Sequence, residues 1–163
     1  MLPRRVILGY PGAAVAGPER RASHIGDQNT GHLSPEAVLR EGGWNPVFAR
    51  VLLIEEHDGH AVVLVDGNGD GAELELEYWV REDDGRWAGA CSSGHSGLGD
   101  LGRAETWADG THVFALGKVG PGTRLRLSYA GKTYSREAGE SGVWGFIAPA
   151  DPRFPGELPI VAS

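Results

Sequence analysis

Two apolar runs joined by a tight turn constrain this chain more than any other feature. The runs cover residues 51–54 and 61–65, and Asp58-Gly59 lies between them. An Asp-Gly pair between two apolar runs is typical of a β-hairpin. Both runs are apolar at consecutive rather than alternate positions, so we expect the two strands to be covered on both faces. Counting outward from the turn pairs Ile54 with Val63 and Leu52 with Val65.

The strand that follows alternates instead. Its even positions from Leu74 to Val80 are apolar, and its odd positions are glutamates apart from Trp79. Alternation of this kind indicates a strand with one face toward the core. After a turn at Asp84-Gly85 the chain returns in a register that predicts Cys91 to be a core thiol. Trp79 falls on the acidic face, where we expect the N-terminal segment to cover it.

Glycine content and repeated turn signals extend this pattern along the chain. The 26 glycines and 10 prolines among 163 residues favour short strands joined by turns. Further strands are predicted at 111–116, 124–129, 132–137 and 143–148. About seven to nine short strands at this spacing predict an all-β fold, an antiparallel β-sandwich that is immunoglobulin-like or related, with a small β-barrel as the second choice.

The predicted organisation is a single β domain over residues 1–163. Its irregular N-terminal segment, 1–45, contains one short helix at 35–41, for which Ser34 is the cap and Gly42 the stop signal. The β core runs from 48 to 148. An extended, proline-rich tail follows at 149–163.

Charge and apolar content narrow the class of partner. The formal net charge is −7, whereas a phosphate-binding surface needs a basic field, so we expect no nucleic-acid partner. No stretch approaches the roughly 20 apolar residues of a membrane span, so we expect no membrane partner. The lack of a usable secretory core and the single cysteine favour the cytoplasm, with secretion as the alternative if the native gene begins upstream. The Ala/Gly/Arg bias resembles that of products of high-GC bacterial genomes.

One loop carries the pattern of a calcium site. It reads Asp-Gly-Asn-Gly-Asp-Gly over residues 66–71. Ca²⁺ takes about six to eight hard oxygen ligands, and alternating Asp, Asn and Asp on a tightly turning backbone can direct three side chains at one centre. Over residues 66–77 the sequence resembles an EF-hand loop. With calcium as the cofactor, the candidate ligands are Asp66, Asn68, Asp70, Glu73 and Glu77.

The loop departs from the EF-hand pattern at two points. Strands rather than helices flank it, and Glu73 stands where an apolar residue is normal. An extended strand carries Glu77 away from the turn at about 3.3 Å per residue, so Glu73 is favoured as the fourth carboxylate. The pattern is closer to the calcium-binding turns of β proteins that lack these helices. Gly, Asn and Asp also make ordinary metal-free hairpin turns, and that interpretation stays open.

Three other motifs carry weaker signals. Residues 97–102 match the dinucleotide fingerprint, but no βαβ unit surrounds them, so we predict no dinucleotide cofactor. Cys91 and Ser96 invite interpretation as nucleophiles, but the last glycine of a nucleophile elbow is missing, so we predict no catalytic residue. His57 and His60 flank the first hairpin turn. Two ligands at a turn make a weak metal site, so we interpret both as turn residues.

Two classes of function fit these residues. The favoured hypothesis is a small, soluble, non-catalytic module that binds a protein or a small molecule and whose 66–77 loop is stabilised by calcium. The alternative is a small β-barrel enzyme or carrier for an apolar small molecule, for example a biosynthetic protein of cyclase type. Such an enzyme can work by orienting its substrate, which needs no recognisable triad. A filled interior favours the first class, and a deep apolar cavity favours the second.

Overall fold

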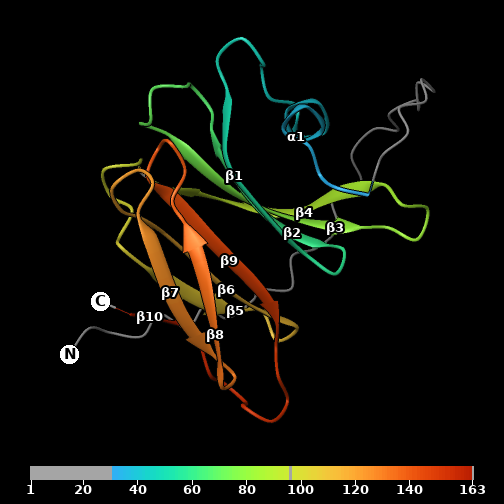
Figure 1. The fold of residues 1–163 in the computed structure, drawn as a ribbon. Helices are drawn as coiled ribbons and strands as arrows, with labels where there is room; N and C mark the ends of the chain where they lie inside the picture. The colour runs from blue at the N-terminus through green and yellow to red at the C-terminus, as the bar shows by residue number, and fades with distance from the viewer. Residues whose placement is uncertain (1–30, 96, 163) are drawn as a thin grey trace.

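The architecture is a stack of antiparallel β-sheets with one helix on the outside (Figure 1). The computed structural model describes residues 31–95 and 97–162, so residues 1–30 of the predicted N-terminal segment, and Ser96, lie outside it. The predicted all-β sandwich is confirmed, and the sheets form no closed barrel within the described ranges. The elements are α1 (Pro35–Gly42), β1 (Arg50–His57), β2 (His60–Asp66), β3 (Leu74–Arg81), β4 (Trp87–His95), β5 (Glu105–Ala108), β6 (His112–Lys118), β7 (Arg124–Tyr129), β8 (Lys132–Glu137), β9 (Val143–Pro149) and β10 (Ile160–Val161).

The short helix is defined by the residues at its ends. Ser34 Oγ accepts a hydrogen bond from Ala37 N, and a proline occupies the first turn. Gly43 ends the helix with a φ of 74°, a left-handed conformation that glycine adopts without steric cost. The predicted helix is confirmed. Its stop lies one residue later than expected, because Gly42 is still helical.

Three sheets follow from the pairing of neighbouring strands. Their orders are β1-β2-β3-β4, β5-β6-β9 and β10-β7-β8, and every pairing is antiparallel. The first hairpin confirms the pairing of Ile54 with Val63. The predicted pairing of Leu52 with Val65 is wrong, because a register shift next to Leu52 places Val51 opposite Val65.

Strand β2 lies between two layers, as its unbroken apolar run predicts. One set of its side chains, including Val63 and Val65, packs with Val38 of the helix. The alternate set packs on the β5-β6-β9 sheet, where Val62 joins Phe114 and Ile147, and Leu64 joins Leu116 and Val143. The first sheet is therefore covered by α1 on one face and by the second sheet on the other (Figure 1).

The second sheet also uses both of its faces. The face turned away from β1–β4 packs against β7 and β8, in the foreground of Figure 1. Trp144 and Phe146 of β9, each 1% exposed, fill this second interface together with Leu125, Leu127 and Tyr129 of β7. This interface is therefore a second apolar core, separate from the one between the first two sheets.

The predictions for Trp79 on β3 and for Cys91 on β4 have different outcomes. Trp79 is 2% exposed and packs with Leu33 and Val38, so the expected cover by the N-terminal segment is confirmed. Trp87 is also buried, in the same cluster as Trp79. The prediction of a core thiol is wrong, because Cys91 is exposed.

The register explains the position of Trp87. Trp79 pairs with Gly89 and Tyr78 pairs with Cys91, so a bulge leaves Ala90 without a partner and places Trp87 opposite Arg81. An extra residue in one strand changes the face that the residues beyond it occupy. Cys91 itself lies opposite Tyr78, but β4 is an edge strand of its sheet and Cys91 is exposed there. No helix among the described residues is long and apolar enough to cross a membrane.

Candidate functional site

The acidic loop between β2 and β3 is held by its own side chains. Asp66 is 3% exposed, and its two carboxylate oxygens accept hydrogen bonds from Gly69 N at 2.9 Å and Gly71 N at 2.8 Å. Both glycines have a positive φ, of 74° and 75°, which a side-chain-bearing residue adopts only with strain. Asp66 therefore caps backbone amides that the sharp turn leaves without strand partners.

The other three candidate ligands in this loop are exposed, and their side chains form hydrogen bonds within the loop. Asp70 Oδ1 accepts a hydrogen bond from Ala72 N at 2.9 Å, and Asn68 Nδ2 donates to Glu73 Oε2 at 3.2 Å. The structure thus brings four of the five predicted ligands into one turn. Within the described ranges, no group of three or more His, Cys, Asp or Glu side chains is arranged to hold a metal ion.

The fifth predicted ligand, Glu77, faces a different part of the molecule. It is 7% exposed on β3, under the segment that follows the helix. Its Oε1 accepts a hydrogen bond from Trp44 Nε1 at 2.7 Å, and its Oε2 accepts one from Trp79 Nε1 at 2.8 Å. Both oxygens are therefore occupied by indoles, and Glu77 is not directed into the loop.

Three histidines meet where the first sheet touches the second. The rings of His60 and His112 have centroids 4.0 Å apart, and the ring of His57 lies 6.4 Å from that of His112. The phenol of Tyr78 stacks on His60, and its hydroxyl lies 2.5 Å from His60 Nδ1. His57 and His60 do adjoin each other at their turn, as the sequence indicates. His112 comes from β6 and completes a cluster that the turn alone does not predict.

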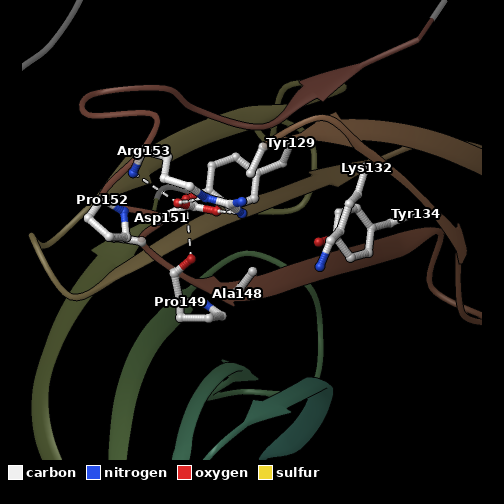
Figure 2. A pocket seen from close by; sticks show the side chains of 10 residues that line it. Tyr129, Lys132, Tyr134, Ala148, Pro149, Asp151, Pro152 and Arg153 are labelled. Carbon is white, nitrogen blue, oxygen red and sulfur yellow. Dashed lines mark hydrogen bonds and ion pairs between the residues drawn. The ribbon is translucent and has the colours of Figure 1, made fainter.

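A groove lies at the end of β7 and β8, against the segment that leaves β9. Four residues of the β7–β8 hairpin and the stretch 148–153 line a space of about 330 Å³. Figure 2 shows Lys132 and Tyr134 on one side of this groove and the Asp151–Arg153 pair on the other. Two alanines and two prolines of the 148–153 stretch make its wall largely apolar.

Hydrogen bonds hold one wall of the groove in place. The hydroxyl of Tyr129 donates to Pro149 O at 3.2 Å and accepts from Asp151 N at 2.8 Å. Arg153 binds the Asp151 carboxylate through two guanidinium nitrogens, at 3.0 Å and 2.7 Å. Hydrogen bonds from the side chain and the backbone of Arg153 lower the pKa of Asp151 to about 2. The aspartate is therefore ionised throughout the physiological pH range.

The opposite wall of the groove carries a lysine and a tyrosine whose side chains a ligand could contact. Lys132 is exposed and Tyr134 is half-buried, two residues apart on the same face of β8. Of the ten lining residues, Lys132 and Arg153 are the cations and Asp151 is the only carboxylate. The ring of Tyr134 rests on Phe146 at 4.9 Å between centroids, so the core supports it from behind.

The comparisons with known proteins identify no relative. No protein-family model matches the chain, and neither the curated proteins nor the solved structures gave a significant match. The class that the fold defines is an antiparallel β-sandwich, and the side chains at its surface are the remaining basis for a functional inference. Sequence reasoning missed both the groove and His112. The alternation that leaves Lys132 and Tyr134 on one face of β8 was the only signal for the groove.

Proposed function

We propose that this protein is a non-catalytic binding module that recognises an extended peptide segment of a partner protein. The groove of Lys132, Tyr134 and the 148–153 stretch is the binding site. The observation that carries this proposal is the pairing of an exposed lysine with a supported tyrosine ring beside a wall of alanine and proline. Aromatic side chains next to small apolar residues accept extended, proline-containing peptides without needing a buried cavity.

The shape of the groove favours a peptide over a small molecule. Small-molecule sites usually enclose most of their ligand. Another hollow, at residues 81–84, is an open surface depression with three carboxylates and one arginine. The interiors between the layers are filled by the four apolar clusters. These features support the module more than the alternative of an enzyme or carrier that encloses an apolar substrate.

Charge and rigidity suggest the chemistry of the peptide. The groove lining carries two cations and one carboxylate, on a chain whose formal net charge is −7. Arg153 is already bound to Asp151, so Lys132 is the cation available to a ligand. We therefore expect a carboxylate of the peptide to lie at Lys132 while an apolar or proline ring covers Tyr134. The bonds of Tyr129 fix the wall beforehand, which lowers the entropy cost of binding.

The test is a titration of ¹⁵N-labelled protein with the peptide acetyl-PPEPP-amide, followed by amide chemical shifts. Saturable shifts confined to residues 129–134 and 148–153 are the expected result. Lys132→Gln should weaken binding about two- to fivefold, the usual worth of an exposed ion pair. Lys118→Gln, which removes a lysine on β6 outside the groove, should leave the affinity for the peptide unchanged. Shifts that do not saturate, or that are equal in both variants, would contradict the proposal.

Stabilisation of the 66–77 loop by calcium is a separate part of this hypothesis. Four oxygen-bearing side chains share that turn, and the affinity expected of them is low because Asp66 already binds two amides. Peptide binding at the groove does not depend on it, since the groove is formed by other strands.

A further inference from the structure

The histidine cluster joins two sheets that come from different parts of the chain. His57 and His60 stand on either side of the β1–β2 turn in the first sheet, and His112 is the first residue of β6 in the second. His112 is only 5% exposed. The ring contact of 4.0 Å between His60 and His112 is therefore part of the interface between the sheets.

The hydrogen bonds around His112 assign its proton. Asp109 Oδ1 accepts from the Thr111 hydroxyl at 2.8 Å and from the backbone N–H groups of Thr111 and His112, each at 2.8 Å. An ionised carboxylate only accepts, so the single hydroxyl hydrogen of Thr111 is used on Asp109. Thr111 Oγ1 must then accept from His112 Nδ1, 3.1 Å away. The network assigns Nδ1–H to His112, and a second proton would have to enter at Nε2.

The surroundings disfavour that second proton. Burial lowers the pKa of His112, the neighbouring rings of His60 and His57 lower it further, and Asp109 and Asp58 oppose them. Asp109 is ionised: burial opposes its charge, but hydrogen bonds from His112 and Thr111 outweigh burial and keep its pKa below the usual value. Burial, with Asp109 next in effect, raises the pKa of Tyr78, so its phenol stays neutral. The titratable or charged groups that face the cluster are His57, His60, Asp58, Tyr78, Asp109 and, beside Tyr78, Cys91.

We propose that these three histidines form an acid-sensitive junction that holds the first and second sheets together while the rings are neutral and loosens when the cluster gains protons. Two imidazolium rings at 4.0 Å would repel each other, and one of them would be buried. Asp58 lies 3.4 Å from Nδ1 of His57, at the rim of the cluster, and that nitrogen makes no hydrogen bond. Positive charge on the buried His112 ring therefore strains the interface.

The direction of the pH effect follows from linkage. In the unfolded chain, histidine has an ordinary pKa of about 6.5. Because the pKa of His112 is lower in the folded protein, the unfolded state binds more protons below about pH 6.5, so the folded state loses stability as the pH falls. The stabilising contribution is complete above that pH. It is lost progressively as the pH falls from there to the folded-state pKa.

The experiment measures the melting temperature, Tm, of the full chain between about pH 7.5 and about pH 5.5, a range in which histidine changes its charge. His112→Asn keeps a donor near the Nδ1 position and removes the titration, so it should abolish about half or more of the fall in Tm seen in the wild type. His32→Gln is the control for removal of a histidine outside the cluster: His32 is exposed and lies 3.1 Å from Glu56, so its replacement should not reduce the fall in Tm. An equal fall in Tm in the wild type and in His112→Asn would overturn the proposal.

A second measurement needs no variant and covers the case in which His112→Asn does not fold. The imidazole carbon and nitrogen resonances of the wild type are followed by NMR over the same pH range. The resonances of His112 should move with a midpoint below the ordinary histidine pKa of about 6.5. Amide exchange at residues 57–61 and 111–114 should accelerate more than exchange at β7 and β8. A midpoint for His112 at or above the ordinary value would refute the junction.

Discussion

Trp44 donates a 2.7 Å hydrogen bond from its indole nitrogen to Oε1 of Glu77, and this contact fastens the segment after helix α1 to the first sheet. The second oxygen of the same carboxylate accepts the indole N–H of Trp79 at 2.8 Å. A buried carboxylate needs hydrogen-bond donors, and two indoles supply them here. Glu77 therefore serves to attach the helical cover to the sheet.

Replacement of Glu77 by glutamine should be clearly destabilising. The carboxamide has one acceptor oxygen and presents an N–H₂ group to the second indole, so one buried donor loses its partner. The expected decrease in the free energy of unfolding is about 1–3 kcal/mol, measured by urea denaturation. Glu75→Gln is the control, because Glu75 lies two residues earlier on the same face of β3 and is half-buried. Equal effects of the two substitutions would argue against the indole contacts.

The fold is predictable where turn chemistry and burial pattern agree. The Asp58-Gly59 turn has positive φ values of 45° and 75°, which these residue types tolerate, and it sets the first hairpin. The unbroken apolar run of β2 correctly indicates a strand between two layers. Strand β10 was missed because two residues are too few to show any alternation. Strand β5 lies in a stretch of small and polar residues that resembles a loop.

The candidate sites are less predictable because distant segments form them. Nothing in the sequence near His60 indicates that His112 will lie against its ring. The prediction for Cys91 fails for a related reason: Cys91 lies opposite Tyr78 on an edge strand, and no local pattern indicates that this part of the edge is exposed. The composition of the acidic loop is visible in the sequence. Whether its side chains bind a metal or the backbone depends on geometry, and the structure shows Asp66 bound to the backbone.

The hydroxyl of Tyr129 should matter more to stability than that of Tyr134. Tyr129→Phe removes the donor to Pro149 O and the acceptor for Asp151 N, both at the wall of the groove. We expect a loss of about 1–3 kcal/mol in the free energy of unfolding and weaker peptide binding. Tyr134→Phe keeps the ring that packs on Phe146 and should change stability by less than about 0.5 kcal/mol. A similar loss in both variants would show that the wall does not depend on this hydroxyl.

The ion pair between Glu55 and Arg136 predicts a second pH effect, of opposite sign to that of the histidines. Glu55 on β1 lies 3.6 Å from Arg136 on β8, and both side chains are mostly buried. Burial raises the pKa of Glu55, and Arg136 only partly opposes this. The folded state therefore binds a proton at Glu55 more tightly than the unfolded state, and this contribution to stability is lost as the pH rises through the folded-state pKa.

Comparison of the wild type with Glu55→Gln isolates this effect. Glutamine stays neutral, so the stability of the wild type relative to the variant should improve as the pH is lowered from about 7 to about 5. Urea denaturation at both pH values measures the difference. Glu137→Gln, which alters an exposed ion pair with Arg124, is the control and should give a much smaller dependence. A difference between wild type and Glu55→Gln that does not change with pH would contradict the raised pKa.

The last prediction concerns calcium binding at the 66–77 loop, and the geometry of the loop limits the affinity that we expect. Both oxygens of Asp66 bind backbone amides, so a bound ion would have to compete with those bonds or rely on the exposed side chains of Asn68, Asp70 and Glu73. Such a site should be weak. With a Kd of about 1 mM, calcium at about 10 mM would stabilise the folded state by about 1.4 kcal/mol and raise Tm by about 3–5 °C.

Two substitutions distinguish the effect of calcium binding from the effect of the hydrogen bonds in the turn. Asp70→Asn should remove most of the rise in Tm caused by calcium and leave the calcium-free Tm nearly unchanged. Asp66→Asn should lower the calcium-free stability by about 1–2 kcal/mol, because it weakens the cap on Gly69 and Gly71. Excess EGTA should reverse the rise, and magnesium should not reproduce it, because magnesium requires a tighter octahedral shell. A Tm that ignores calcium, or that rises equally in Asp70→Asn, would mean that the loop is a hydrogen-bonded turn and that the calcium hypothesis is wrong.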